Sequence, residues 1–129
     1  IDQELQLRIK NTMAKFDDIW GRDWKNSFSE ANLSVIKVGM DNGISEYQVL
    51  VTELQDDFYN KNDNLKAYSN NMIQASNYRI SAMQIVKDGI TNGDLADKMD
   101  IIKQTVADAD DKLVKAAMSA VKSGYKTGE

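Results

Sequence analysis

The sequence predicts an all-α protein, an elongated antiparallel bundle of three long helices within one domain that covers residues 1–129. Two observations support this fold class. Apolar residues recur every three or four positions along most of the chain, which is the spacing of one buried helical face. The chain also contains no proline, which is normally about one residue in twenty, so no residue forces a break in a helix.

The first helix is expected at about residues 3–39. A glycine at position 21, and the capping-box spacing of Ser27 and Glu30, also permit a break or kink near residues 22–27. Because a glycine inside a helix costs only about 1 kcal/mol, we favour the continuous helix here. The apolar stripe of this helix consists of Leu5, Ile9, Met13, Phe16, Trp20, Trp24, Phe28, Ala31, Val35 and Val38.

The second helix is expected at about residues 46–89. Three asparagines lower helix propensity near residues 60–63, but the apolar spacing resumes in phase after them, so we favour a continuous helix there. A break at this place or in the first helix would convert the bundle into one of four or five helices. The second stripe consists of Tyr47, Leu50, Leu54, Phe58, Leu65, Tyr68, Met72, Ser76, Ile80, Met83, Val86 and Ile90.

A short phrase, Gly-x-x-Asn-Gly, occurs at residues 39–43 and again at residues 89–93. The first glycine of each phrase suits the left-handed position just past a helix end, and Asn-Gly suits a tight turn. Ser45, which has capping-box spacing to Gln48, and Asp94 are the expected N-caps of the helices that follow. We interpret the phrase as two helix–helix corners built by the same chemistry.

The third helix is expected at about residues 94–123. Aspartates gather near its start and lysines near its end, an arrangement that complements the helix dipole. Its apolar stripe consists of Leu95, Met99, Ile102, Val106, Ala109, Leu113, Ala117 and Val121.

The residue types that are missing exclude most enzyme chemistry. The chain has no histidine and no cysteine, which removes Ser-His-Asp and Cys-His catalysis, disulfides, and ordinary zinc, copper and haem sites. The acidic clusters at residues 56–57 and 108–111 are interpreted as solvated helix faces. We therefore expect no enzymatic activity, no catalytic residue, no cofactor and no metal. A net charge of −4 without a basic block disfavours a nucleic-acid partner.

Three side chains are candidates for binding. Trp20 and Trp24 lie one turn apart on the first stripe, where they either pack one end of the bundle or offer one indole as an anchor for a partner protein. Arg79 is the only charged residue in its neighbourhood. It either grips a carboxylate ligand between helices, as in a sensor bundle, or extends its stem so that the guanidinium reaches solvent.

The length of the helices favours recognition over chemistry. An unbroken helix of 37 residues would be about 55 Å long, whereas a compact globule of this size has a radius of gyration near 14 Å. Such a rod exposes long apolar seams, and these usually meet helices of other copies or of partners, as in coiled coils.

The leading hypothesis is a non-enzymatic protein–protein interaction or structural module, a secreted or surface-associated bacterial component that acts through a helix face, by self-association or with a protein partner. The alternative is an extracytoplasmic ligand-sensing bundle of a membrane receptor with flanking membrane helices outside residues 1–129. Membrane contact is expected only in that second case. An extracellular, cell-surface or periplasmic location suits both.

Overall fold

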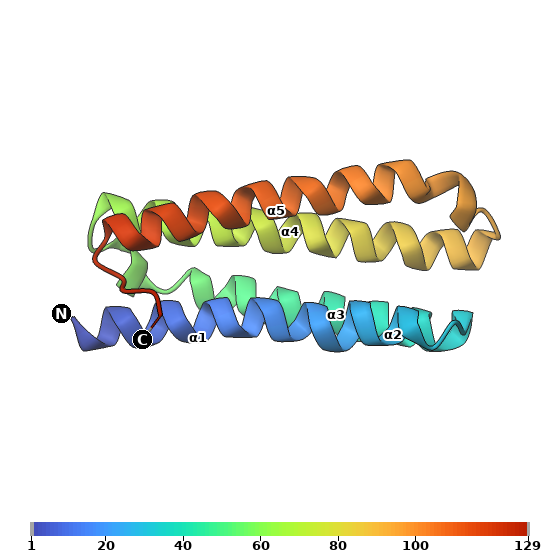
Figure 1. The fold of residues 1–129 in the computed structure, drawn as a ribbon, viewed down its shortest axis with the longest axis horizontal. Helices are drawn as coiled ribbons and strands as arrows, with labels where there is room; N and C mark the ends of the chain where they lie inside the picture. The colour runs from blue at the N-terminus through green and yellow to red at the C-terminus, as the bar shows by residue number, and fades with distance from the viewer. Residues whose placement is uncertain (1, 129) are drawn as a thin grey trace.

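The computed structural model describes residues 2–128 and shows a chain of helices in which these residues form no strand. Four long rods lie side by side and reverse direction at each connection (Figure 1). The first rod is continuous and combines α1 (Gln3–Ile19), a π-helical turn (Trp20–Lys25) and α2 (Asn26–Ser29). The others are α3 (Leu33–Leu54), α4 (Asp63–Asn92) and α5 (Met99–Lys122), with 3₁₀ turns at Asp57–Asn60 and Leu95–Lys98. The all-α prediction is confirmed, and four rods replace the three that we favoured.

The predicted helix over residues 3–39 is divided at residues 30–32. Ala31 adopts a left-handed conformation with φ 52°, which ends the first rod. Asn32 then caps α3, because its side-chain oxygen accepts hydrogen bonds from the backbone N–H groups of residues 34 and 35. The new helix starts in a different phase. Consequently Ile36 and Met40 are buried, and the predicted core residues Val35 and Val38 are exposed.

The weak point predicted near residues 22–27 is a distortion of the helix that does not interrupt it. The backbone N–H of Asn26 bonds to the carbonyl of Gly21, five residues earlier, as in a π-helix. Ser27 is not an N-cap. Its hydroxyl donates to the carbonyl oxygens of Asp23, at 2.7 Å, and Trp24, at 3.1 Å, inside the rod. These two hydrogen bonds satisfy carbonyl oxygens of the π-helical turn.

The prediction of a corner at residues 39–43 is wrong, because Gly39 and Gly43 are buried inside α3. A Cβ atom on Gly39 would lie 2.5 Å from the carbonyl oxygen of Asp23 and 2.7 Å from the Cβ of Ser27. The two glycines therefore allow the backbone of α3 to approach the π turn. As a result, Ser45 is an exposed residue in mid-helix and caps nothing.

The corner predicted at residues 89–93 is present, but its glycines have other roles. α4 ends at Asn92, and Gly93 is the left-handed residue, with φ 74°. Gly89 is still helical, and a Cβ there would lie 3.0 Å from the Cα of Leu95. Asp94 makes no capping hydrogen bond with its side chain.

The continuous helix that we favoured through residues 60–63 is also wrong. Asp56 accepts a hydrogen bond from the N–H of Phe58, and Asn62 accepts one from the N–H of Leu65. These local side-chain bonds compete with the helix and start new turns, so the break that the asparagines permitted is the one that forms.

The core lies between the four rods, and α5 contributes least to it. α5 packs mainly against α4, and its fully buried residues include three alanines. The largest fully buried side chains elsewhere are Tyr47, Tyr68, Phe16, Ile9, Met40, Leu50, Leu54, Leu65, Met72, Met83 and Val86. One side of α5 is thus left without a partner helix.

Candidate functional site

The two tryptophans lie in an aromatic column on the first rod. Their rings are stacked, with centroids 4.3 Å apart and planes 13° apart, and the ring of Phe28 continues the column 4.9 Å beyond Trp24. Trp20 is buried, whereas Trp24 is only half-buried. Of the two indoles, Trp24 is therefore the one that offers surface to a partner.

Arg79 lies inside the bundle at the end of this column. It is 4% exposed, and its Cζ is 3.9 Å from the ring centroid of Phe16 and 4.4 Å from that of Trp20. The guanidinium therefore does not reach solvent, and the interpretation that Arg79 extends into water is wrong. A carboxylate ligand could reach it only if this stack opened.

The polar contacts of Arg79 join α4 to the other three rods. Its guanidinium donates to the hydroxyl of Tyr47 at 3.0 Å and to the carbonyl of Phe16 at 3.3 Å, and it pairs with Asp110 at 3.5 Å. The Tyr47 hydroxyl also donates to the Phe16 carbonyl, at 2.8 Å. Burial raises the pKa of Tyr47 to about 12, so this donor keeps its proton at neutral pH.

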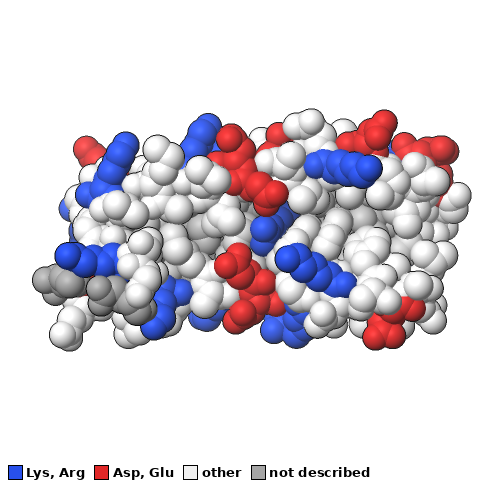
Figure 2. Space-filling model, in the orientation of Figure 1, with Lys and Arg blue, Asp and Glu red and all other residues white. Residues whose placement is uncertain are grey.

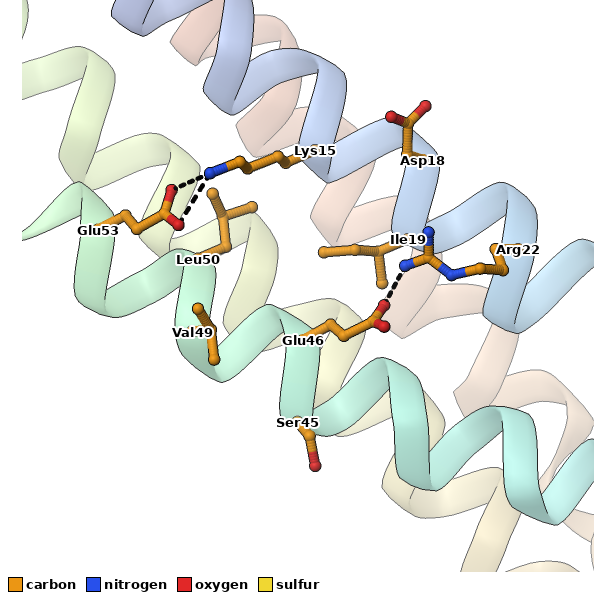
Figure 3. Close-up of a pocket in the computed structure, with 9 residues that line it drawn as sticks. All are labelled: Lys15, Asp18, Ile19, Arg22, Ser45, Glu46, Val49, Leu50 and Glu53. Carbon is orange, nitrogen blue, oxygen red and sulfur yellow. Dashed lines mark hydrogen bonds and ion pairs between the residues drawn. The ribbon is translucent and has the colours of Figure 1, made fainter.

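A groove follows the contact between the first rod and α3. Three ion pairs join the first rod to α3 or to the turn that follows it, and their basic partners are spaced seven residues apart: Arg8 with Asp56, Lys15 with Glu53, and Arg22 with Glu46. The Arg22–Glu46 pair separates two hollows of this groove. Figure 3 shows the first, of about 310 Å³, where Ile19 and Leu50 lie between the two ion pairs that it draws.

The second hollow lies beside the π turn and has a volume of about 480 Å³. We call it the π-turn hollow. Asp23, Asn26 and Glu30 line it from the first rod, and α3 contributes Asn42 and Glu46, among others. Its wall thus offers several oxygen atoms that can accept hydrogen bonds.

Asp23 is the most unusual side chain of this hollow. It is only 5% exposed, yet one carboxylate oxygen, Oδ2, has no hydrogen-bond partner. The other, Oδ1, lies 3.6 Å from the Nε of Arg22, which is beyond ordinary hydrogen-bond length. Buried polar groups normally have hydrogen-bond partners, so a proton on Asp23 or a ligand that donates to it would satisfy this oxygen.

The protonation of Asp23 is linked to its neighbour Glu46. Burial, together with the hydrogen bond that a protonated Asp23 would donate to Glu46 and the negative charge of Glu46, raises the pKa of Asp23 to about 6. Burial alone would also raise the pKa of Glu46, but the hydrogen bonds that Glu46 accepts from a protonated Asp23 and from Arg22 outweigh burial and lower it. Two carboxyl groups therefore share one guanidinium, and Asp23 is the one that retains a proton more readily.

Sequence reasoning missed Asp23, although its spacing was informative. It lies seven residues after Phe16, which itself lies seven after Ile9, on the same buried face. A charged residue at a core position of this kind is the pattern that could have identified it.

A second candidate surface is the side of α5 that no rod covers. Val114, Met118 and Val121 are 59%, 56% and 54% exposed. They are spaced by four and three residues and therefore form one line along the helix. We call this line the α5 stripe.

The two halves of α5 carry opposite net charges. Its first thirteen residues, 99–111, contain four aspartates and one lysine, for a net charge of −3, and its last eleven, 112–122, contain three lysines and no acid, for +3. Along the upper edge of Figure 2, where α5 runs, basic side chains predominate toward its C-terminal end and acidic ones toward its N-terminal end.

Among the helices that the structure describes, none is long and apolar enough to cross a membrane. In residues 2–128, no group of three or more acidic side chains is placed to hold a metal ion. Searches against protein-family models, curated proteins and solved structures found no match to this chain.

Proposed function

We propose that the protein is a non-enzymatic interaction module that binds through the α5 stripe, and that its partner there is the α5 helix of a second copy. The observation that carries this proposal is the line of three exposed apolar side chains on a helix that packs mainly against α4. Burial of such side chains stabilises association by about 25 cal/mol per Å² of apolar surface before the costs of binding are subtracted.

The division of charge favours a second copy over an unrelated helix. If two α5 helices pair antiparallel about a two-fold axis near the middle of the helix, at about residue 111, the acidic half of each faces the basic half of the other, and the α5 stripe of each packs against the N-terminal half of the partner helix. A parallel pair would place like charges opposite each other. The same sequence on both sides therefore supplies an attraction and selects one orientation.

Analytical ultracentrifugation over a range of protein concentrations tests this proposal. We expect the unchanged protein to dimerise reversibly, and the double variant Val114→Glu/Met118→Glu to remain monomeric, because the new glutamates remove the apolar contact and face the acidic half of the partner helix. Leu7→Glu is the matched control. Leu7 is 58% exposed on the first rod, so this variant should dimerise like the unchanged protein.

A second measurement separates the electrostatic part. Higher salt should weaken the dimer, since the paired charges are exposed at its edge. The proposal is overturned if the unchanged protein stays monomeric at the highest concentration, or if the double variant and the Leu7 control associate equally well. Circular dichroism on each variant verifies that the helices are intact.

Ligand sensing is the second candidate function. Both ends of the described chain leave the same end of the bundle, where the side chain of Gln6 donates to the Lys126 carbonyl at 2.7 Å and accepts from its N–H at 2.9 Å (Figure 1). A bundle held by one end leaves its far end free to receive a ligand. The π-turn hollow lies toward that far end, and its unpartnered carboxylate is the observation that favours this candidate.

A further inference from the structure

We propose that the π-turn hollow is a binding site for a primary ammonium group carried on a short apolar chain, either a small alkylamine or a lysine side chain. The site is separate from the α5 stripe and does not depend on dimerisation. It would supply the second candidate function with its class of ligand.

The first support is the unpartnered carboxylate. Asp23 is nine-tenths or more buried, lines the hollow, and has an oxygen atom without any donor. An ammonium group carries three N–H donors and a positive charge, so it can supply both the missing hydrogen bond and the missing counter-charge.

The second support is the balance of charge around the hollow. Three acidic side chains line it, Asp23, Glu30 and Glu46, against the single basic side chain of Arg22. Arg22 is already hydrogen-bonded to Glu46, and it is 55% exposed. Its guanidinium can therefore move away from Asp23, toward solvent, while it keeps Glu46, which opens a path for a second cation to Asp23.

The third support is the shape and chemistry of the walls. The amide side chains of Asn26 and Asn42 offer further acceptors, and Val35 and Val38 offer apolar surface to an alkyl chain. Gly39 keeps this space open, since a Cβ there would collide with the π turn and push α3 outward. A metal ion has no alkyl chain that could pack against these two valines, so the apolar wall favours an alkylamine.

The proton is the competing occupant of Asp23. A protonated Asp23 can donate to Glu46, and it no longer attracts a cation. The charged groups that face it across the hollow are Arg22, Glu30 and Glu46, while α4 presents the apolar side chain of Met83 nearby. Amine affinity should therefore fall as the pH is lowered through about 6, although the amine itself, with a pKa near 10, stays charged.

The test is a titration with n-butylamine at constant ionic strength, followed by ¹H–¹⁵N NMR on the intact chain. At about pH 8 we expect saturable shifts of the amide signals of Asp23, Gly39 and Gly43, and about tenfold weaker binding in Asp23→Asn, since a charged hydrogen bond is lost. Asp18→Asn is the matched control. Asp18 is exposed on the same rod and lines the neighbouring hollow, so its removal should leave the affinity unchanged.

A second arm identifies the source of the ammonium group. A short neutral peptide with one lysine is compared with the same peptide carrying acetyl-lysine. Tighter binding of the lysine peptide than of butylamine supports a partner's lysine side chain, and the reverse order supports a small amine.

Several results overturn the proposal. They are a titration with no saturation, equal shifts with sodium chloride, or equal affinity in Asp23→Asn and the unchanged protein. The pH dependence in the unchanged protein tests the site without any substitution. An affinity that does not fall between about pH 8 and about pH 5 also overturns it.

Discussion

At Asp23 the folded chain removes a carboxyl group from water without giving it a hydrogen-bond donor. An ionised carboxylate in such a place costs free energy, so the folded state binds the proton more tightly than the unfolded chain does. The pKa of Asp23 rises from 3.8 to about 6. This single residue therefore links the stability of the π turn to pH.

The sign of this linkage can be tested with Asp23→Asn. Because the folded-state pKa is raised, the stabilisation by the proton is full below about pH 4 and lost as pH rises toward about 6, up to about 3 kcal/mol. The lowered pKa of Glu46 acts in the opposite direction, below its ordinary value of 4.5. Urea unfolding between about pH 4.5 and pH 7 should show stability falling in the unchanged protein and nearly constant in Asp23→Asn. Parallel curves for the two proteins would contradict this.

Two glycines of the first rod and α3 have opposite tolerances for a side chain. A Cβ on Gly39 would lie 2.5 Å from a backbone oxygen that cannot move alone, whereas Gly21 has nothing within 4 Å. We expect Gly39→Ala to lower the free energy of unfolding by about 3 kcal/mol through overpacking. Gly21→Ala should raise it by about 0.5–1 kcal/mol through helix propensity. Denaturant unfolding of both variants measures this, and equal effects would show that α3 does not approach the π turn.

At the scale of elements, asparagines determine where α3 and α4 begin. Asn32 starts α3 and Asn62 starts α4, each by accepting a hydrogen bond from a backbone N–H of the first turn. Capping-box spacing predicts this role for Ser27 and Ser45, but both serines lie inside helices. A capping pattern is local, and it acts only where the preceding chain has left the helix.

Removal of these caps has a defined cost. Asn32→Ala and Asn62→Ala should each lower the free energy of unfolding by about 1 kcal/mol, because N–H groups of the first turn lose their acceptor. Ser45→Ala is the control, and it should change stability by less than about 0.5 kcal/mol, since Ser45 is exposed in mid-helix. Thermal unfolding distinguishes the two groups. A Ser45 effect as large as that of Asn32 would support the corner that we first predicted.

At the scale of the whole molecule, Arg79 holds the four rods in one arrangement. It belongs to α4, stacks on rings of the first rod and bonds to the hydroxyl of Tyr47 on α3. Its ion pair with Asp110 of α5 is long, and the aspartate side chain is 61% exposed. The stack and the buried hydrogen bonds, more than the ion pair, should therefore account for its contribution to stability.

This ranking predicts different losses at the two ends of the pair. Arg79→Ala should destabilise the fold by about 3 kcal/mol, since it leaves a cavity between aromatic rings, and Arg79→Met should restore most of the loss. Asp110→Asn should cost less than about 0.5 kcal/mol. Urea unfolding of the three variants measures these values. An effect of Asp110→Asn as large as that of Arg79→Ala would show that the ion pair dominates.

Apolar spacing predicted the helical class and most of the core residues of α4, and the Gly-x-x-Asn-Gly phrase predicted the turn that follows α4. The sequence also identified the two tryptophans, which lie one turn apart, and Arg79, the only charged residue in its neighbourhood, as candidate binding residues. The sequence did not show which of the two Gly-x-x-Asn-Gly phrases forms a corner between helices. Gly43 and Gly93 hold the same place in the repeated phrase, and Gly43 lies in mid-helix while Gly93 is left-handed.

The sequence by itself determined that the chain forms helices and which faces of most of them are apolar, because periodicity is a property of neighbouring residues. Only the tertiary structure decided that the glycines of α3 meet the π turn, that Asp23 is buried beside them and that Arg79 lies among rings. Each of these depends on what a distant segment places opposite the residue. A glycine serves a turn and a close contact equally well, and a charge is buried only where another rod covers it.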